Sequence, residues 1–129
     1  PVWLFERIKD MRFGFLAKRF RTSVNREVYK WYVKNLLNRY VLLPSGEVTL
    51  QTCGNPSGQV STTMDNNMTN TWLQAFEFIY LNGLSFDDAV DKWEDYDTLI
   101  YGDDRLSTTP IIPDNYVERV VEMYRDIFR

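Results

Sequence analysis

The chain has 129 residues, 44% hydrophobic and 16% aromatic content, a formal net charge of −3, one cysteine and no histidine. This length suits one domain with a sizeable core, and the apolar content excludes a disordered chain. One cysteine excludes an internal disulfide, and the absence of histidine removes Ser-His and Cys-His catalysis and argues against zinc. No uninterrupted apolar run of about 18 residues is present to span a membrane. Oxygen-ligated metal chemistry survives these exclusions.

The charge is divided unevenly along the chain. Residues 1–40 hold ten Lys or Arg and three Asp or Glu, whereas residues 41–129 hold five and fifteen. A basic segment beside an acidic one suits a polyanion bound near an acidic, metal-holding site. Solvated helix faces that pair with acidic neighbours would give the same distribution, so charge alone leaves both interpretations open.

The first third of the chain predicts two helices followed by a hairpin. Pro1 suits the first position of a helix, and apolar residues then recur at steps of three and four. Ser23 or Asn25 can cap a second helix, whose predicted buried face consists of Val28, Trp31, Tyr32, Leu36 and Tyr40. An aromatic, basic helix is also able to stack on nucleic acid, but the periodicity favours a core face. The apolar runs on either side of Pro44-Ser45-Gly46 predict a hairpin.

A loop and a long helix follow this hairpin. Residues 53–59 contain two glycines and a proline, which is typical of a loop whose backbone approaches a ligand closely. The helix is predicted from Ser61 to Asn82, with Gly83 ending it. Thr62 and Asn66 are four residues apart and therefore share one face. Both lie near the helix N-terminus, where the partial positive charge favours a phosphate.

The last third predicts a short helix, a tight hairpin and a final helix. Ser85 and Asp88 form a capping box for a helix that extends to about Glu94. Tyr101-Gly102-Asp103-Asp104 lies between two short apolar runs and predicts a hairpin turn, because glycine accepts the positive φ that such a turn requires. Asp114 is expected to cap an amphipathic helix at the end of the chain.

The predicted turn carries the main chemical signal of the sequence. It would present Asp103 and Asp104 together at the tip of the hairpin. Adjacent carboxylates repel each other, and a hard divalent cation such as Mg²⁺ relieves this repulsion while keeping waters for a phosphate-bearing substrate. An acidic turn without chemistry is the alternative, because Gly and Asp are frequent in turns. Taken alone, the Gly-Asp-Asp turn favours this alternative.

Two stretches taken together resemble a known family, the RNA-directed RNA polymerases of positive-strand RNA viruses. The loop and helix that carry Ser57, Gly58, Thr62 and Asn66 resemble the Ser-Gly-x-x-x-Thr-x-x-x-Asn motif of that family. Tyr101-Gly102-Asp103-Asp104 resembles the Gly-Asp-Asp hairpin of the polymerase palm. The order and the spacing of the two stretches also fit. Within the family, the sequences Met64-Asp65-Asn66-Asn67 and Asp103-Asp104-Arg105-Leu106 are most similar to those of astrovirus polymerases.

The resemblance implies an enzyme that transfers nucleotides from nucleoside triphosphates to an RNA 3′ end and replicates a viral RNA genome. Asp103 and Asp104 would be the catalytic carboxylates and would hold two metal ions, Mg²⁺ or Mn²⁺. These ions would activate the 3′ hydroxyl and stabilise the leaving pyrophosphate. The implied partners are an RNA template and primer, and nucleoside triphosphates. The implied location is the host cell cytoplasm, at viral replication complexes.

The resemblance also assigns four residues to nucleotide binding. Ser57 and Gly58 would form a mobile loop that meets the template and the incoming nucleotide. Thr62 and Asn66 would read the ribose 2′-hydroxyl, which distinguishes RNA from DNA building blocks. A reverse transcriptase has a similar palm but does not select this hydroxyl, so these two residues favour an RNA polymerase over that alternative.

The expected fold is α+β, a small antiparallel sheet with helices packed on one face. The resemblance implies that residues 1–129 are a single partial domain, an internal segment of the palm that starts after an upstream aspartate motif. The remaining fingers, palm and thumb segments would complete the enzyme, and the segment alone would be inactive. A non-catalytic helical interaction module, in which Gly-Asp-Asp is only a turn, is the second alternative.

Overall fold

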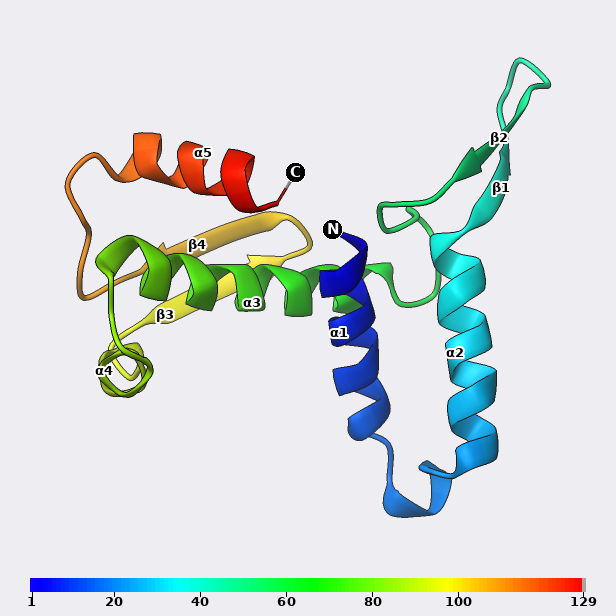
Figure 1. The fold of residues 1–129 in the computed structure, drawn as a ribbon, viewed down its shortest axis with the longest axis horizontal. Coiled ribbons are helices and arrows are strands. Elements are labelled where there is room, and N and C mark those ends of the chain that lie inside the picture. Colours follow the sequence, from blue (N-terminus) through cyan, green and yellow to red (C-terminus); the bar gives the residue numbers. More distant parts are fainter. Residues whose placement is uncertain (129) are drawn as a thin grey trace. The chain divides into compact units, whose positions relative to one another are not determined.

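The structure is a computed structural model that describes residues 1–128. Five α-helices, one short 3₁₀ helix and two antiparallel β-hairpins make up this described chain (Figure 1). The chain divides into two compact units, Pro1–Asp65 and a second unit that begins at Asn66. The expected α+β class is confirmed, with the strands arranged as one two-stranded sheet in each unit.

The first unit consists of two helices and a hairpin. Its helices and strands are α1 (Val2–Gly14), a 3₁₀ turn (Lys18–Phe20), α2 (Ser23–Leu37), β1 (Arg39–Leu42) and β2 (Val48–Gln51). Strands β1 and β2 pair in antiparallel register, and the turn between them contains Gly46 at a φ of +88°. The hairpin predicted around this turn is therefore confirmed.

The buried face of α2 differs from the predicted one. Phe5, Val33 and Leu37 form the core between α1 and α2, with Tyr29, Tyr32 and Leu36 packed against it. Val28 and Trp31 are instead 60% and 68% exposed, and Tyr40 lies beyond the end of the helix, in β1, where it is 80% exposed. The helix carries two apolar stripes, and periodicity alone does not tell which of them packs on a neighbour.

The start of α2 also differs from the prediction by one residue. Thr22 is the cap, because its Oγ1 accepts a hydrogen bond from the backbone N–H of Asn25 at 3.2 Å. Ser23 is the first residue of the helix, and Asn25 donates to the cap instead of being one. Three residues able to cap a helix, Thr22, Ser23 and Asn25, lie within four positions, so the local sequence does not tell which of them is the cap.

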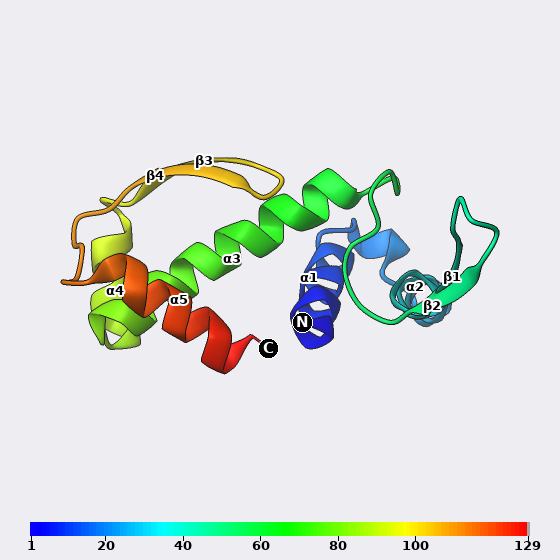
Figure 2. The ribbon, with the colours of Figure 1, turned by 90° about the horizontal axis from the view of Figure 1, so that it is seen from above.

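The second unit is built on α3 (Thr62–Asn82), a long helix whose first residues belong to the first unit. The other elements are α4 (Phe86–Trp93), β3 (Asp97–Tyr101), β4 (Asp104–Thr108) and α5 (Tyr116–Ile127). The hairpin of β3 and β4 runs along α3 in both views of the ribbon (Figures 1 and 2). Helix α5 is also held to α3, through contacts described below.

The helix ends of the second unit follow the predicted signals at two of three places. Gly83 ends α3 at a φ of +59°, and the N–H of Leu84 donates to the carbonyl of Ile79 at 3.1 Å, as in a Schellman motif. Ser85 caps α4 as predicted. The predicted cap of α5 at Asp114 is wrong, since Asn115 precedes the helix in the left-handed region at a φ of 54°. Asparagine tolerates this conformation better than most residues.

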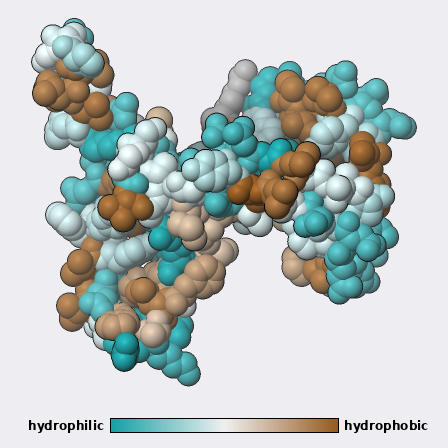
Figure 3. Space-filling model, turned by 180° about the vertical axis from the view of Figure 1, so that it is seen from behind, coloured by the Kyte–Doolittle hydropathy of each residue, from teal (hydrophilic) through white to brown (hydrophobic). Residues whose placement is uncertain are grey.

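The core of the second unit is small and rich in aromatic rings. Trp93 stacks on Tyr96 with ring centroids 4.2 Å apart, and Phe78 meets both rings edge-on. Hydrophobic side chains also remain on the surface of both units, visible as brown patches in Figure 3. Within residues 1–128, no helix combines the length and the apolar character needed to cross a membrane.

Candidate active site

The side of α3 that faces the β3–β4 hairpin is polar, although it is buried. Asn70, Gln74 and Glu77 are 9%, 1% and 3% exposed. Their spacing of four and three residues places them on one face of the helix, which we call the polar face. Buried polar groups need partners, and the hairpin and α5 supply them. The polar face therefore fixes the hairpin by directed contacts.

The polar face and the neighbouring Asn67 hold the turn of the hairpin by its backbone. The N–H of Gly102 donates to Oδ1 of Asn67 at 2.6 Å. Nδ2 of Asn70 donates to the carbonyls of Gly102 at 3.3 Å and of Asp103 at 3.2 Å. Because these contacts use main-chain atoms, they position the turn without using either carboxylate. The side chains of Asp103 and Asp104 stay exposed.

The strand β3 is held one helical turn further along. Oε1 of Gln74 accepts hydrogen bonds from the hydroxyls of Thr98 at 2.9 Å and Tyr96 at 3.0 Å. Nε2 of the same side chain donates to Oδ1 of Asn70 at 3.3 Å. Gln74 thus connects the contact at the turn to the contact at the strand.

The strand β4 is held by an ion pair between a partly exposed arginine and a buried glutamate. Both Nη atoms of Arg105 donate to the two carboxylate oxygens of Glu77, at 2.9 and 2.6 Å. The hydroxyls of Tyr116 and Tyr124 donate to the same carboxylate from the region of α5. Burial raises the pKa of the Tyr124 hydroxyl far above its usual value, and its hydrogen bond to Glu77 adds to this shift. The hydrogen bonds to Glu77 raise the pKa of Arg105 as well.

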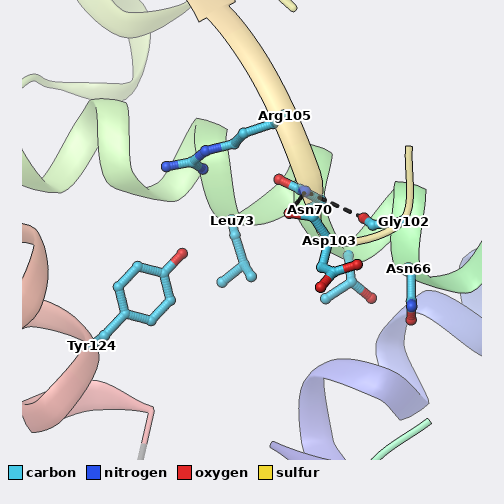
Figure 4. Close-up of a pocket in the computed structure, with 8 residues that line it drawn as sticks. Asn66, Asn70, Leu73, Gly102, Asp103, Arg105 and Tyr124 are labelled. Carbon is cyan, nitrogen blue, oxygen red and sulfur yellow. Dashed lines mark hydrogen bonds between the residues drawn. The ribbon is translucent and has the colours of Figure 1, made fainter. Parts of the chain in front are cut away.

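A pocket of about 300 Å³ opens between α3, the hairpin and α5. Figure 4 shows the carboxylate of Asp103 turned into this pocket. Of the six residues predicted for the site, Asn66 and Asp103 line it together. The complete lining consists of Asn66, Thr69, Asn70, Leu73, Gly102, Asp103, Arg105 and Tyr124.

The acid pair suits a divalent cation as part of a larger donor set. Asp103 and Asp104 offer exposed oxygen donors on a turn whose backbone is fixed. Residues 1–128 contain no group of three His, Cys, Asp or Glu side chains placed to hold a metal ion. Mg²⁺ is commonly bound by one or two carboxylates together with waters and substrate phosphates. The residues present therefore fit such an ion without enclosing it.

The other three predicted residues lie in the first unit. Ser57 and Gly58 are exposed, and Gly58 has a φ of +79° that glycine accepts easily. Oγ1 of Thr62 lies 2.7 Å from the carbonyl oxygen of Pro56 and 3.0 Å from that of Gln59. The hydroxyl has one proton, which it donates to these two carbonyls. Thr62 therefore stabilises the loop, while the lone pairs of its hydroxyl still accept hydrogen bonds.

The same loop is tied to a buried charge cluster that the sequence did not reveal. Asp65 is 0% exposed and accepts hydrogen bonds from Lys9 at 2.6 Å and from Arg12. Gln59 and Ser61 donate to it as well, both at 2.9 Å. Burial acts to raise the pKa of Asp65, but the hydrogen bonds from Lys9, Arg12 and Ser61 outweigh it and hold the pKa below its usual value. Polar residues in the first turn of a helix normally face solvent, so no local pattern points to this site.

An α+β fold with an exposed acid pair on the turn of a fixed hairpin is consistent with a segment of a polymerase palm. The model of a protein family described as viral RNA-dependent RNA polymerase matches residues 1–127, and the chain belongs to this family.

The chain is also similar to curated viral polyproteins. It is 65% identical over 128 residues to the non-structural polyprotein 1AB of Human astrovirus-5 and of Human astrovirus-1, and 58% identical over 129 residues to that of Ovine astrovirus 1. These matches cover 99% of the chain and 9% or 10% of each polyprotein. The chain thus spans about a tenth of the length of these relatives. No solved structure matches it.

Proposed function

We propose that the chain forms part of the palm of a viral RNA-directed RNA polymerase, which adds nucleotides to an RNA 3′ end during genome replication. The observation that supports this most is the fixation of the hairpin turn by Asn67 and Asn70, which leaves both carboxylates exposed. An ordinary acidic turn needs no such fixation. Membership of the polymerase family supports the same function.

In this proposal Asp103 and Asp104 hold Mg²⁺ or Mn²⁺. The ions, when bound, activate the attacking 3′ hydroxyl and stabilise the charge on the leaving pyrophosphate. The chain's own contribution is to keep both carboxylates at the tip of a rigid turn, since the polar face holds the main chain beneath them. Further oxygen donors come from another part of the polymerase.

Asn66 reads the sugar of the incoming nucleotide. It lines the same pocket as Asp103, so a group bound by Asn66 lies near the metal-binding carboxylate. An amide both donates and accepts hydrogen bonds and therefore matches a ribose 2′-hydroxyl. Thr62, four residues earlier on α3, accepts from the same hydroxyl, while Ser57 and Gly58 contact the template and the nucleotide.

The partners in this proposal are nucleoside triphosphates, an RNA template with its primer, and the remaining fingers, palm and thumb segments. The exposed basic residues of the first 40 positions offer phosphate contacts to the RNA, whereas Lys9 is buried against Asp65. The work of the polymerase takes place in the cytoplasm of the host cell, at viral replication complexes.

The substitution Asp103→Asn in the full-length polymerase tests this proposal. We expect it to lower the rate of nucleotide addition by more than about a hundredfold, because it removes a ligand from the metal. The measurement is single-nucleotide extension of a primed RNA template. Asp126→Asn is the matched control, an acid-to-amide change at an exposed position of α5 that breaks the ion pair with Arg125. Normal extension by Asp103→Asn would favour a non-catalytic interaction module.

A further inference from the structure

We propose that Glu77 is a positioning residue that keeps Arg105 away from Asp103 and Asp104 and so keeps these carboxylates available to a divalent cation. This inference rests on the proposed function of the acid pair. Glu77 itself does not line the pocket into which Asp103 points.

Arg105 is a strong potential competitor for the acid pair. It follows Asp104 directly in the sequence, and its side chain lines the same pocket as Asp103. A guanidinium binds a carboxylate through two parallel hydrogen bonds, and such pairs are among the strongest polar contacts in proteins. An unrestrained arginine at this position would therefore neutralise an acid that the cation needs.

Glu77 prevents this competition by binding the same guanidinium in the two-point geometry. Its carboxylate lies on the polar face, with a side-chain exposure of 4%. Both Nη atoms of Arg105 are bound to it, and Figure 4 shows the guanidinium pointing away from Asp103. Glu77 thus binds both ends of the guanidinium that would otherwise be free to pair with the acid.

The two tyrosine hydroxyls complete the restraint. Tyr116 and Tyr124 donate to the carboxylate oxygens of Glu77, so the carboxylate itself cannot rotate without losing hydrogen bonds. A buried carboxylate that binds one guanidinium and two hydroxyls has its accepting positions filled. The position of Arg105 is therefore determined by three elements, α3, β4 and the α5 region.

The test is Mn²⁺ binding to the full-length polymerase without RNA or nucleotide, measured by electron paramagnetic resonance of the free ion. We expect Glu77→Gln to weaken Mn²⁺ binding about tenfold, because a neutral amide presents only one acceptor to the guanidinium and releases it toward the acid pair. The double variant Glu77→Gln with Arg105→Gln should bind Mn²⁺ within about twofold of the parent, since no competing cation remains.

The double variant separates this role from a purely structural one. If Glu77 only stabilised the fold, removing its partner as well would not restore Mn²⁺ binding. Equally weak binding by the single and double variants would overturn the proposal. So would parental affinity in the single variant.

Further variants keep the test decisive if Glu77→Gln does not fold, or if Asp103 does not bind the metal ion. Arg105→Lys keeps the charge but offers Glu77 one ammonium group, so it should weaken Mn²⁺ binding about threefold even if Glu77→Gln does not fold. Parental affinity in Arg105→Lys would count against the proposal. Asp126→Asn is expected to bind like the parent. If Asp103→Asn also binds like the parent, the proposed function fails, which is distinct from a negative result at Glu77.

Discussion

Asp65 shows how strongly one side chain can organise a loop. Its carboxylate is completely buried and lies within hydrogen-bond distance of Lys9, which is itself 1% exposed. Through Gln59 and Ser61 the same carboxylate also holds the end of the loop that carries Ser57 and Gly58. The position of this loop therefore depends on a residue that is itself completely buried.

We expect Asp65→Asn to destabilise this region by about 3 kcal/mol, because it leaves the buried ammonium of Lys9 without a counter-charge. The measurement is hydrogen exchange of peptides from residues 53–65 in the full-length polymerase. Asp10→Asn is the control. Its pair with Arg26 is exposed and 3.4 Å long, so this substitution should change exchange little.

The lowered pKa of Asp65 also predicts a dependence on acid. An unfolded carboxyl has a pKa near 3.8, and the folded one lies lower. The ionised carboxylate therefore contributes its full stability above that value and loses it as the pH falls through the folded pKa. Protection of residues 53–65, corrected for the intrinsic exchange rate, should fall in this acid range in the parent. The profile should be flatter in Asp65→Asn, and an equally steep profile would contradict this explanation.

At the scale of single residues, sequence reasoning found the exposed groups and missed the buried ones. Asp103 and Asp104 could be placed on a turn because glycine next to an acid is a local signal. Asn70, Gln74 and Glu77 could not be recognised, since a polar residue on a helix normally indicates the solvent side. Their partners lie on β3, β4 and α5, far away in the sequence. Only the fold shows these pairings.

The β3–β4 hairpin is the element that carries the proposed chemistry, and Gly102 determines its turn. Tyr101 pairs with Asp104 in the ladder, so the loop has two residues. The φ of Gly102 is +66°, whereas the φ of Asp103 is not positive. This combination is expected for a type II′ turn. The predicted role of glycine in this turn is thus confirmed.

Gly102→Ala should lower the rate of nucleotide addition about tenfold without a steric clash. A Cβ at this position meets no neighbouring atom within 4 Å, so the cost is that of a left-handed backbone alone, about 1–2 kcal/mol. Primer extension measures the effect. Gly14→Ala is the matched control, because its Cβ is equally unobstructed and its backbone has no positive φ. Equal rates for the two variants would argue against the importance of the turn conformation.

At the scale of elements, the predicted helices and hairpins are all present, and the errors lie at caps and faces. Ser85 and Gly83 correctly predict helix ends, because the hydrogen bonds that they make join residues only three positions apart in the sequence. The periodicity of α2 predicts a buried Trp31, but this side chain is exposed, because the helix has two apolar stripes. Which stripe is buried depends on α1, and that is a tertiary choice.

For the molecule as a whole, the proposed chemistry requires more donors than the described chain brings together. Residues 1–128 hold no cluster of three potential ligands around the acid pair. We therefore expect the isolated chain to bind Mn²⁺ weakly and to extend no primer, because a two-metal centre needs more carboxylates than two on one turn. Primer extension by the isolated chain would contradict this expectation. The full-length polymerase serves as the positive control.

The polar face of α3 also limits how this protein can change over time. Among the described residues, no buried side-chain nitrogen or oxygen lacks a hydrogen-bond partner. Replacement of Gln74 alone by an apolar residue would leave the hydroxyls of Tyr96 and Thr98 without their hydrogen-bond acceptor. Each unpaired hydroxyl would lower the free energy of unfolding by about 1–3 kcal/mol. Two compensating replacements on different elements avoid most of that loss. We therefore expect a substitution on the polar face of α3 to be accompanied, among related sequences, by a substitution of its hydrogen-bond partner on the strand or helix that α3 contacts.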